Sequence, residues 1–223
     1  MTPAFTIKDA FSYGWNKLSE NFWFLVLLAL AFFVLGAALE SGPRDEFTIG
    51  KFVNIFVSFF AMFTFVRFGL KIGKGEKPFW NNLFEFKPEI FGFYILASLA
   101  YSAMNLIGLA LIIVPGIISI IRFGFFGFIM VDEGLRPIHS LKKSWAITKG
   151  HFWKLFGLSV CLLVLNFFGA LAMGLGLLIT VPLSLLVTVY VYQKIKGAPL
   201  PLVAEPIAPP AVIIPPAGPA ATV

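Results

Sequence analysis

Six long runs of apolar residues, separated by short polar segments, set the pattern of this chain. A helix needs roughly 20 apolar residues to cross the hydrocarbon core of a bilayer. The runs cover Phe22 to Leu39, Phe52 to Leu70, two parts of Ile90 to Met130, and two parts of Leu155 to Gln193. The pattern therefore predicts six transmembrane helices, in which Arg67 and Arg122 are the only charged residues.

The two longest runs are each too long for one helix, and each contains a turn signal near its middle. In the first, the signal is Val114-Pro115-Gly116, because proline cannot continue a helix but suits the first turn of a new one. In the second, it is Gly174-Leu175-Gly176, because glycine permits a tight turn. With the first pair joined by Glu40 to Lys51, the six helices are expected as three hairpins.

The composition excludes an ordinary soluble protein. Of the 223 residues, 59% are hydrophobic and 13% are charged, whereas soluble domains carry about 25% charged residues. Too few polar side chains remain to cover the apolar surface of a soluble fold of this size. The chain is therefore expected to be an all-α integral membrane protein.

Positive charge is distributed unequally between the two sides of the predicted membrane. Fourteen Lys and Arg residues fall on one side, and only Arg44 and Lys51 fall on the other. Cytoplasmic loops carry an excess of Lys and Arg. We therefore expect a multi-pass protein of the inner or plasma membrane with both termini in the cytoplasm. Phe22 to Leu39 is expected to be an uncleaved first helix rather than a signal peptide.

The net charge of +6 follows from the same bias. In a membrane protein, such a charge favours contact with anionic lipid, and no nucleic-acid-binding motif accompanies it. The expected partners are therefore membrane lipids, especially anionic ones, and not nucleic acid. A protein partner or a second copy of the chain is a further candidate.

Two polar segments that precede predicted spans have an apolar stripe at helical spacing. The first stripe comprises Ile7, Phe11, Trp15, Leu18 and Phe22, and the second comprises Ile138, Leu141, Trp145 and Phe152. The cations Lys142, Lys143 and Lys149 lie mostly beside the second stripe. A third, less regular stripe runs from Phe79 to Phe84. Such helices lie in the membrane interface with their cations toward headgroups, or they pack on the protein's own bundle, and the pattern leaves both readings open.

An internal repeat connects these segments to the spans. The pattern Trp-x6-Phe-Trp occurs at residues 15–23 and again at residues 145–153. Three units, at about 1–70, 75–131 and 135–193, therefore each consist of an interfacial amphipathic helix and a hairpin, and form a membrane domain over residues 1–196. Many transporters have inverted repeats and broken helices near the midplane. Here all units enter from one side, and no span is expected to be broken at its centre.

The composition changes after Lys196. Residues 197–223 contain eight prolines, many alanines and one charged side chain. This composition is typical of an extended, disordered segment. We therefore predict a disordered Pro/Ala-rich cytoplasmic tail.

One stretch resembles a known family. The residues concerned are Val114-Pro115-Gly116-Ile117, Arg122-Phe123, Val131-Asp132-Glu133-Gly134, Ser140 to Trp145, and Thr148 to Trp153. Together they resemble the membrane domain of glycerophosphoryl diester phosphodiesterases and the related YciC-like prokaryotic membrane proteins. With the hairpin pattern, the resemblance spans roughly residues 1–196 and implies a six-helix membrane domain of mostly unassigned function. Some of these relatives are fused to a soluble phosphodiesterase, and we expect this chain to lack one.

Candidate chemistry is sparse. The spans carry Asn, Ser and Thr but no carboxylate, and the chain has no nucleophile elbow, HExxH motif or phosphate loop. The single cysteine, Cys161, excludes an intrachain disulfide, and the two histidines are far apart. The adjacent Asp132 and Glu133 lie beside several cations and are interpreted as an ion-pair cluster. We therefore expect no catalytic residue, no metal and no cofactor, and predict that the protein is not an enzyme.

Arg122 is the most distinctive single residue of the sequence, because it is a charged residue inside a predicted span. It lies seven residues after Pro115, about 10 Å along a helix. A charge at that depth costs at least ~2.5 kcal/mol, so it needs a partner, a wet cavity or a lipid phosphate. Asn105, Asn166 or backbone carbonyls are candidates to solvate Arg122. The other interpretation is a site for an anion or a lipid headgroup on the outer side of the membrane, with Arg122, Asn105 and Asn166 as the candidate residues.

These features predict a non-catalytic multi-pass membrane protein that binds anionic lipid or a protein partner and supports membrane or envelope organisation. The alternative is a transporter or channel-like protein for an anion or lipid that uses Arg122. Because the spans lack carboxylates, proton- or sodium-coupled transport is disfavoured. A lipid-modifying enzyme is the third hypothesis.

Overall fold

The computed structural model describes residues 5–40, 49–83, 85–111, 113–172 and 174–197, and within these ranges it is all-helical, without strands. The predicted tail and most of the connection between the first two spans lie outside them. The elements are α1 (Ile7–Glu20), α2 (Phe22–Glu40), α3 (Ile49–Gly73), the 3-10 turn η1 (Trp80–Leu83), α4 (Pro88–Leu111), α5 (Ile113–Phe123), α6 (Phe126–Glu133), α7 (Pro137–Ile147), α8 (Phe152–Leu171) and α9 (Leu177–Lys196).

Six helical stretches of the described chain are long and apolar enough to cross a membrane, as predicted. They cover Phe22–Glu40, Gly50–Gly73, Pro88–Gly108, Pro115–Glu133, Phe152–Leu171 and Leu177–Lys196. Large apolar side chains such as Phe33, Leu106 and Leu163 are exposed on them, far more than a soluble monomer displays. These surfaces are compatible with a multi-pass membrane protein. The kind of membrane and the side on which the termini lie stay predictions.

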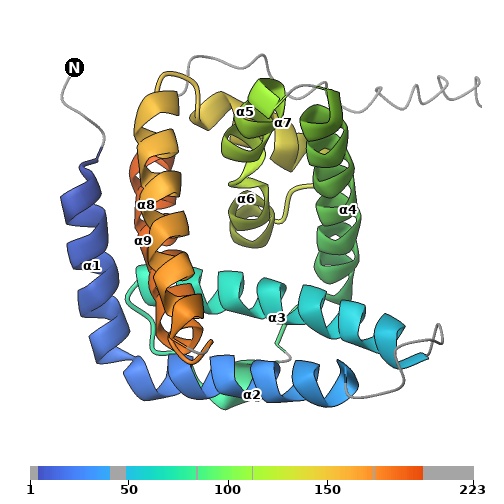
Figure 1. Cartoon of the computed structure of the whole chain (residues 1–223), viewed down its shortest axis with the longest axis vertical. Helices are drawn as coiled ribbons and strands as arrows, with labels where there is room; N and C mark the ends of the chain where they lie inside the picture. The colour runs from blue at the N-terminus through green and yellow to red at the C-terminus, as the bar shows by residue number, and fades with distance from the viewer. Residues whose placement is uncertain (1–4, 41–48, 84, 112, 173, 198–223) are drawn as a thin grey trace, which may run out of the picture.

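The six apolar helices form three packed pairs that do not run in one direction. Helix α2 packs on α3, α4 on α5, and α8 on α9. Figure 1 shows α2 and α3 running across the direction of α4, α8 and α9, with α5, α6 and α7 between α4 and the α8–α9 pair. The arrangement of all three pairs as hairpins that enter one membrane from the same side therefore stays a prediction.

The turn between α8 and α9 falls at the glycines that predicted it. Gly174 has a φ of +78°, a conformation that glycine adopts without steric cost. A Cβ at Gly176 would lie 2.6 Å from the carbonyl oxygen of Gly169, so the two helices approach closely only because both residues are glycine. Below this turn, the side chains of Asn166 and Ser184 hydrogen-bond at 2.9 Å.

Helix α9 forms the centre of the fold, and α1 packs along it. Helix α9 also contacts α2, α3 and α8, and Leu186, Val187 and Val189 are fully buried in it. The buried face of α1 consists of Ala10, Gly14 and Leu18. Of the two readings that the sequence leaves open for this amphipathic helix, the structure shows contact with the protein's own helices.

The second repeat unit differs from the other two. Its segment before the span forms only the short turn η1 instead of an amphipathic α-helix. The guanidinium of Arg67 donates to the main-chain carbonyls of Asn82, Leu83 and Glu85 around this turn. A single cation therefore satisfies backbone groups that a helix would have paired internally.

Close packing of α1 on α9 yields a stability prediction. A Cβ at Gly14 would lie 2.6 Å from Val187 Cγ2 and 3.3 Å from the Val187 backbone nitrogen, whereas a Cβ at Gly92 in α4 meets nothing within 4 Å. We expect Gly14→Ala to lower the free energy of unfolding by about 1–3 kcal/mol through overpacking. Gly92→Ala, the matched control, gains helix propensity. Thermal unfolding in detergent, followed by circular dichroism, checks this, and a Gly14→Ala variant as stable as Gly92→Ala would contradict it.

Candidate functional site: an interrupted helix beside Arg122

The fourth apolar stretch is not a continuous helix, contrary to the expectation that no span is broken. Helix α5 ends at Phe123 and α6 begins at Phe126, with Gly124 and Phe125 in a turn between them. Figure 1 shows α5 and α6 pointing in different directions. An interruption leaves carbonyls at the end of one helix and N–H groups at the start of the next without partners in their own helix. Buried groups of this kind must be paired elsewhere.

Helix α7 provides these partners through a row of buried hydroxyls. Ser140, Ser144 and Thr148 follow at four-residue intervals, and all three are buried. The Ser144 hydroxyl donates to the Arg122 carbonyl at 2.8 Å and accepts from the Phe125 N–H at 3.2 Å. The Thr148 hydroxyl lies 3.4 Å from the same carbonyl. One serine thus connects the two sides of the interruption.

The side chain of Arg122 lies against α7 as well. Its Cζ is 4.6 Å from the centroid of the Trp145 ring, which is a cation–π contact. Its Nε is buried and has no hydrogen-bond partner. Across the described residues, no carboxylate forms an ion pair with Arg122. Because a guanidinium has five N–H donors, Arg122 retains the capacity to bind an acceptor.

The opposite side of α7 from the hydroxyls is cationic and aromatic. Ile138, Lys142, Trp145 and Lys149 are exposed, and their spacing of four, three and four residues places them on one side of the helix. Lys149 lies just past the last residue of α7. We call the group formed by Arg122, Lys142, Trp145 and Lys149 the Arg122–Trp145 face.

Among the described residues, neither predicted asparagine forms a hydrogen bond with Arg122. Asn105 accepts a hydrogen bond from Ser119 at 2.8 Å and so joins α4 to α5. Asn166 donates to Ser184 at 2.9 Å and so joins α8 to α9. Small polar residues in membrane helices commonly bond neighbouring helices in this way. The sequence did not indicate Trp145, Ser144 and Thr148 as neighbours of Arg122. Ser144 and Thr148 are four residues apart, however, and this spacing places them on one side of a helix.

Lys143 belongs to a separate ion-pair cluster. Its Nζ lies 2.6 Å from Glu133 Oε2, while Asp132 pairs with Lys74 at 2.8 Å and with Lys196 at 2.5 Å. The side chain of Asp132 is only 8% exposed. The cluster joins the ends of α6 and α9 and the middle of α7 to the residue that follows α3. The interpretation of Asp132 and Glu133 as an ion-pair cluster matches this geometry, but Lys74 and Lys196 come from distant parts of the chain that the sequence did not connect to them.

A metal site has no basis in the part of the chain that the structure describes. There, no three His, Cys, Asp or Glu side chains are grouped in a way that could hold a metal ion. The free Cys161 is exposed on α8. The chemistry that this region offers is therefore that of hydrogen-bond donors and cations, which bind anions.

Comparison with known proteins shows a family of which no function is recorded. Residues 80–218 match the family described as Domain of unknown function (DUF7847). The chain belongs to this family. An uncharacterised protein of Mycobacterium bovis and one of Mycobacterium tuberculosis are each 26% identical to it over 229 residues, which cover 88% of this chain and 70% of each relative. No solved structure matches the chain.

The bridge formed by Ser144 yields a second prediction. Ser144→Ala leaves the Phe125 N–H without its partner and the Arg122 carbonyl with only the Thr148 contact at 3.4 Å, and an unsatisfied buried polar group costs about 1–3 kcal/mol. We expect a clear fall in the unfolding temperature of the Ser144→Ala variant in detergent. Ser12→Ala, which changes an exposed serine of the amphipathic helix α1, is the matched control. Equal unfolding temperatures for the two variants would show that Ser144 does not support the interruption.

Proposed function

We propose that the chain is a non-catalytic multi-pass membrane protein that binds the headgroup of an anionic lipid at the Arg122–Trp145 face, and that it supports membrane organisation in this way. The observation that carries the proposal is Arg122 itself. Its guanidinium contacts an exposed tryptophan, its Nε has no acceptor, and no described carboxylate neutralises it.

A lipid phosphate fits these groups chemically. Guanidinium and phosphate form paired, charge-assisted hydrogen bonds. Lys142 and Lys149 share the outward side of α7 with Trp145, and each cation near an anionic leaflet contributes about 1 kcal/mol. Tryptophan itself is enriched at the level of the headgroups. The face thus combines a directional phosphate ligand, two long-range charges and an interfacial anchor.

The interrupted helix supports the proposal by fixing the position of Arg122. The carbonyl of Arg122 accepts a hydrogen bond from Ser144 of α7. The side chain of Arg122 contacts Trp145, which follows Ser144 in α7. Arg122 is therefore held at both its backbone and its side chain by α7. A group held in its bound geometry loses less entropy when a ligand arrives.

The topology belongs to the same proposal. The excess of Lys and Arg on one side favours an inner or plasma membrane with both termini toward the cytoplasm. Because Arg122 contacts Trp145, we assign the Arg122–Trp145 face to the cytoplasmic side too, instead of the outer side expected from the sequence. The proposal also includes the resemblance to the membrane domain of glycerophosphoryl diester phosphodiesterases, which concerns the membrane domain alone. A protein partner or a second copy of the chain is a further proposed partner, and nucleic acid is not.

The interruption favours one alternative, a transporter or channel-like protein for an anion or lipid. Broken helices near the midplane often form the substrate sites of transporters, and α5 and α6 are separated directly after Arg122. This alternative predicts that liposomes containing the protein release or flip an anion or an anionic lipid, and that Arg122→Leu abolishes the flux. Lipid binding without flux would favour the first function.

The lipid proposal predicts a loss of binding when Arg122 is replaced. Native mass spectrometry of the purified protein with phosphatidylglycerol is expected to show bound lipid that falls by about tenfold in Arg122→Leu, since a charged hydrogen bond contributes about 1.5–3 kcal/mol. Arg122→Lys is expected to retain part of the binding, because lysine keeps the charge but not the paired hydrogen bonds.

Two controls make this experiment specific. Lys154→Gln removes an exposed cation from the start of α8, outside the face, and is expected to leave binding unchanged. Phosphatidylcholine, which has no net charge, is expected to bind less than phosphatidylglycerol. Equal lipid retention by wild type and Arg122→Leu would reduce Arg122 to a structural residue and refute the proposal.

A further inference from the structure

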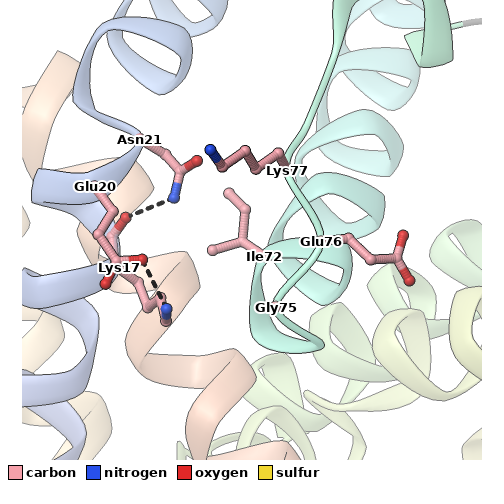
Figure 2. Close-up of a pocket in the computed structure, with 7 residues that line it drawn as sticks. All are labelled: Lys17, Glu20, Asn21, Ile72, Gly75, Glu76 and Lys77. Carbon is pink, nitrogen blue, oxygen red and sulfur yellow. Dashed lines mark hydrogen bonds and ion pairs between the residues drawn. The ribbon is translucent and has the colours of Figure 1, made fainter.

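A hollow of about 350 Å³ lies between the last turn of α1 and the end of α3, built from different elements than the Arg122–Trp145 face. Figure 2 shows Lys17, Glu20 and Asn21 on one wall and the segment with Ile72 and Lys77 on the other. The volume is at the lower end of small-molecule sites, which suits a polar headgroup rather than a whole lipid.

Lys77 brings an unpaired positive charge to this hollow. In Figure 2 its side chain extends across the hollow toward the side chain of Asn21. Among the residues that the structure describes, no carboxylate is paired with Lys77. The amide nitrogen of Asn21 donates to the Lys17 carbonyl at 3.1 Å, so its carbonyl oxygen is left as an acceptor on the wall opposite Lys77.

Glu20 brings a carboxylate to the hollow, and only one of its two oxygens is paired with Lys17. Its Oε2 lies 2.7 Å from Lys17 Nζ, and no described residue bonds to its Oε1. The hydrogen bond from Lys17 to Glu20 raises the pKa of Lys17, so Lys17 keeps its positive charge at neutral pH. Between the walls lies the side chain of Ile72, which is 1% exposed. Glu76 also belongs to the lining, but Figure 2 shows its side chain directed away from Lys77 and Asn21.

The hollow lies where the chain enters its first apolar helix. Helix α2 begins at Phe22, directly after Asn21. Trp23 is 74% exposed, and the exposed Trp80 lies 4.9 Å from Phe24 between ring centroids. Exposed tryptophans mark the membrane–water interface, which is the level of lipid headgroups.

We infer that this hollow binds the headgroup of a zwitterionic phospholipid that carries a primary ammonium group, with its phosphate at Lys77 and its ammonium at Glu20. Lys77 and Glu20 lie on opposite walls of the hollow, and two opposite charges in this arrangement match a zwitterion better than an anion. A primary ammonium has three N–H donors for a carboxylate, whereas a choline group has none. The acyl chains then lie along the exposed apolar surface of α2. This site does not depend on the Arg122–Trp145 face.

Calorimetric titration of the purified full chain with short-chain lipids tests the inference. Dihexanoyl phosphatidylethanolamine is expected to bind about tenfold more tightly than the phosphatidylcholine analogue, because a charge-assisted hydrogen bond is worth at least tenfold in affinity. Lys77→Gln is expected to weaken the binding of both lipids by a similar factor. Glu20→Gln is expected to weaken the binding of phosphatidylethanolamine alone, and so to remove the preference for it over phosphatidylcholine. Lys154→Gln, which removes an exposed cation elsewhere, is expected to change nothing.

Three results would overturn the inference. The first is equal binding by Lys77→Gln and Lys154→Gln. The second is a preference for phosphatidylethanolamine that survives Glu20→Gln. The third is binding of phosphatidylglycerol as tight as that of phosphatidylethanolamine in an Arg122→Leu background, which would show a site for phosphate alone. In that background the anionic site is removed, so failure of one proposal is distinguishable from failure of the other.

Discussion

The structure depends on how a broken helix keeps its backbone hydrogen-bonded. Between α5 and α6 the chain leaves a carbonyl at Arg122 and an N–H at Phe125 that no residue of the same helix satisfies. In an apolar environment, each such group costs several kcal/mol when unpaired. The hydroxyl of Ser144 bonds to both, so α7 is required at this position. The orientation of Arg122 and the outward side of α7 follow from that requirement.

Helix α7 is held in place by hydrogen bonds and by an ion pair. Near its middle and end, Ser144 and Thr148 reach the interruption, while one residue before Ser144, Lys143 forms an ion pair with Glu133 at the end of α6. These contacts lie on the inward side, so Lys142, Trp145 and Lys149 stay directed outward. The polar bonding that completes the broken helix thereby also arranges the proposed lipid-binding face. Structure and proposed function are linked here through one short helix.

Much of the architecture could be predicted because it depends on local properties of the chain. Hydrophobic run length indicated the six apolar helices, and the turn at Gly174 follows from backbone freedom. The interruption after Arg122 could not be predicted in this way, because Gly124 is tolerated in a continuous helix and the deciding partner, Ser144, is 22 residues away. The stripe of α7 was judged from its apolar residues, whereas the buried residues of this helix include Ser140 and Ser144 beside Leu141 and Ile147. The partners of Asp132 were missed for the same reason: Lys74 and Lys196 meet it only in the folded chain.

Amide hydrogen exchange at Phe125 tests the central claim most directly. If Ser144 accepts from the Phe125 N–H, this amide is protected in the wild type. In Ser144→Ala it should then exchange at least about tenfold faster, as expected for the loss of a hydrogen bond of about 1.5 kcal/mol. Amides in the middle of α9 should keep their rates, because α9 does not take part in the bridge. Unchanged exchange at Phe125 in Ser144→Ala would show that α5 and α6 form a continuous helix with its own hydrogen bonds, and would contradict the account.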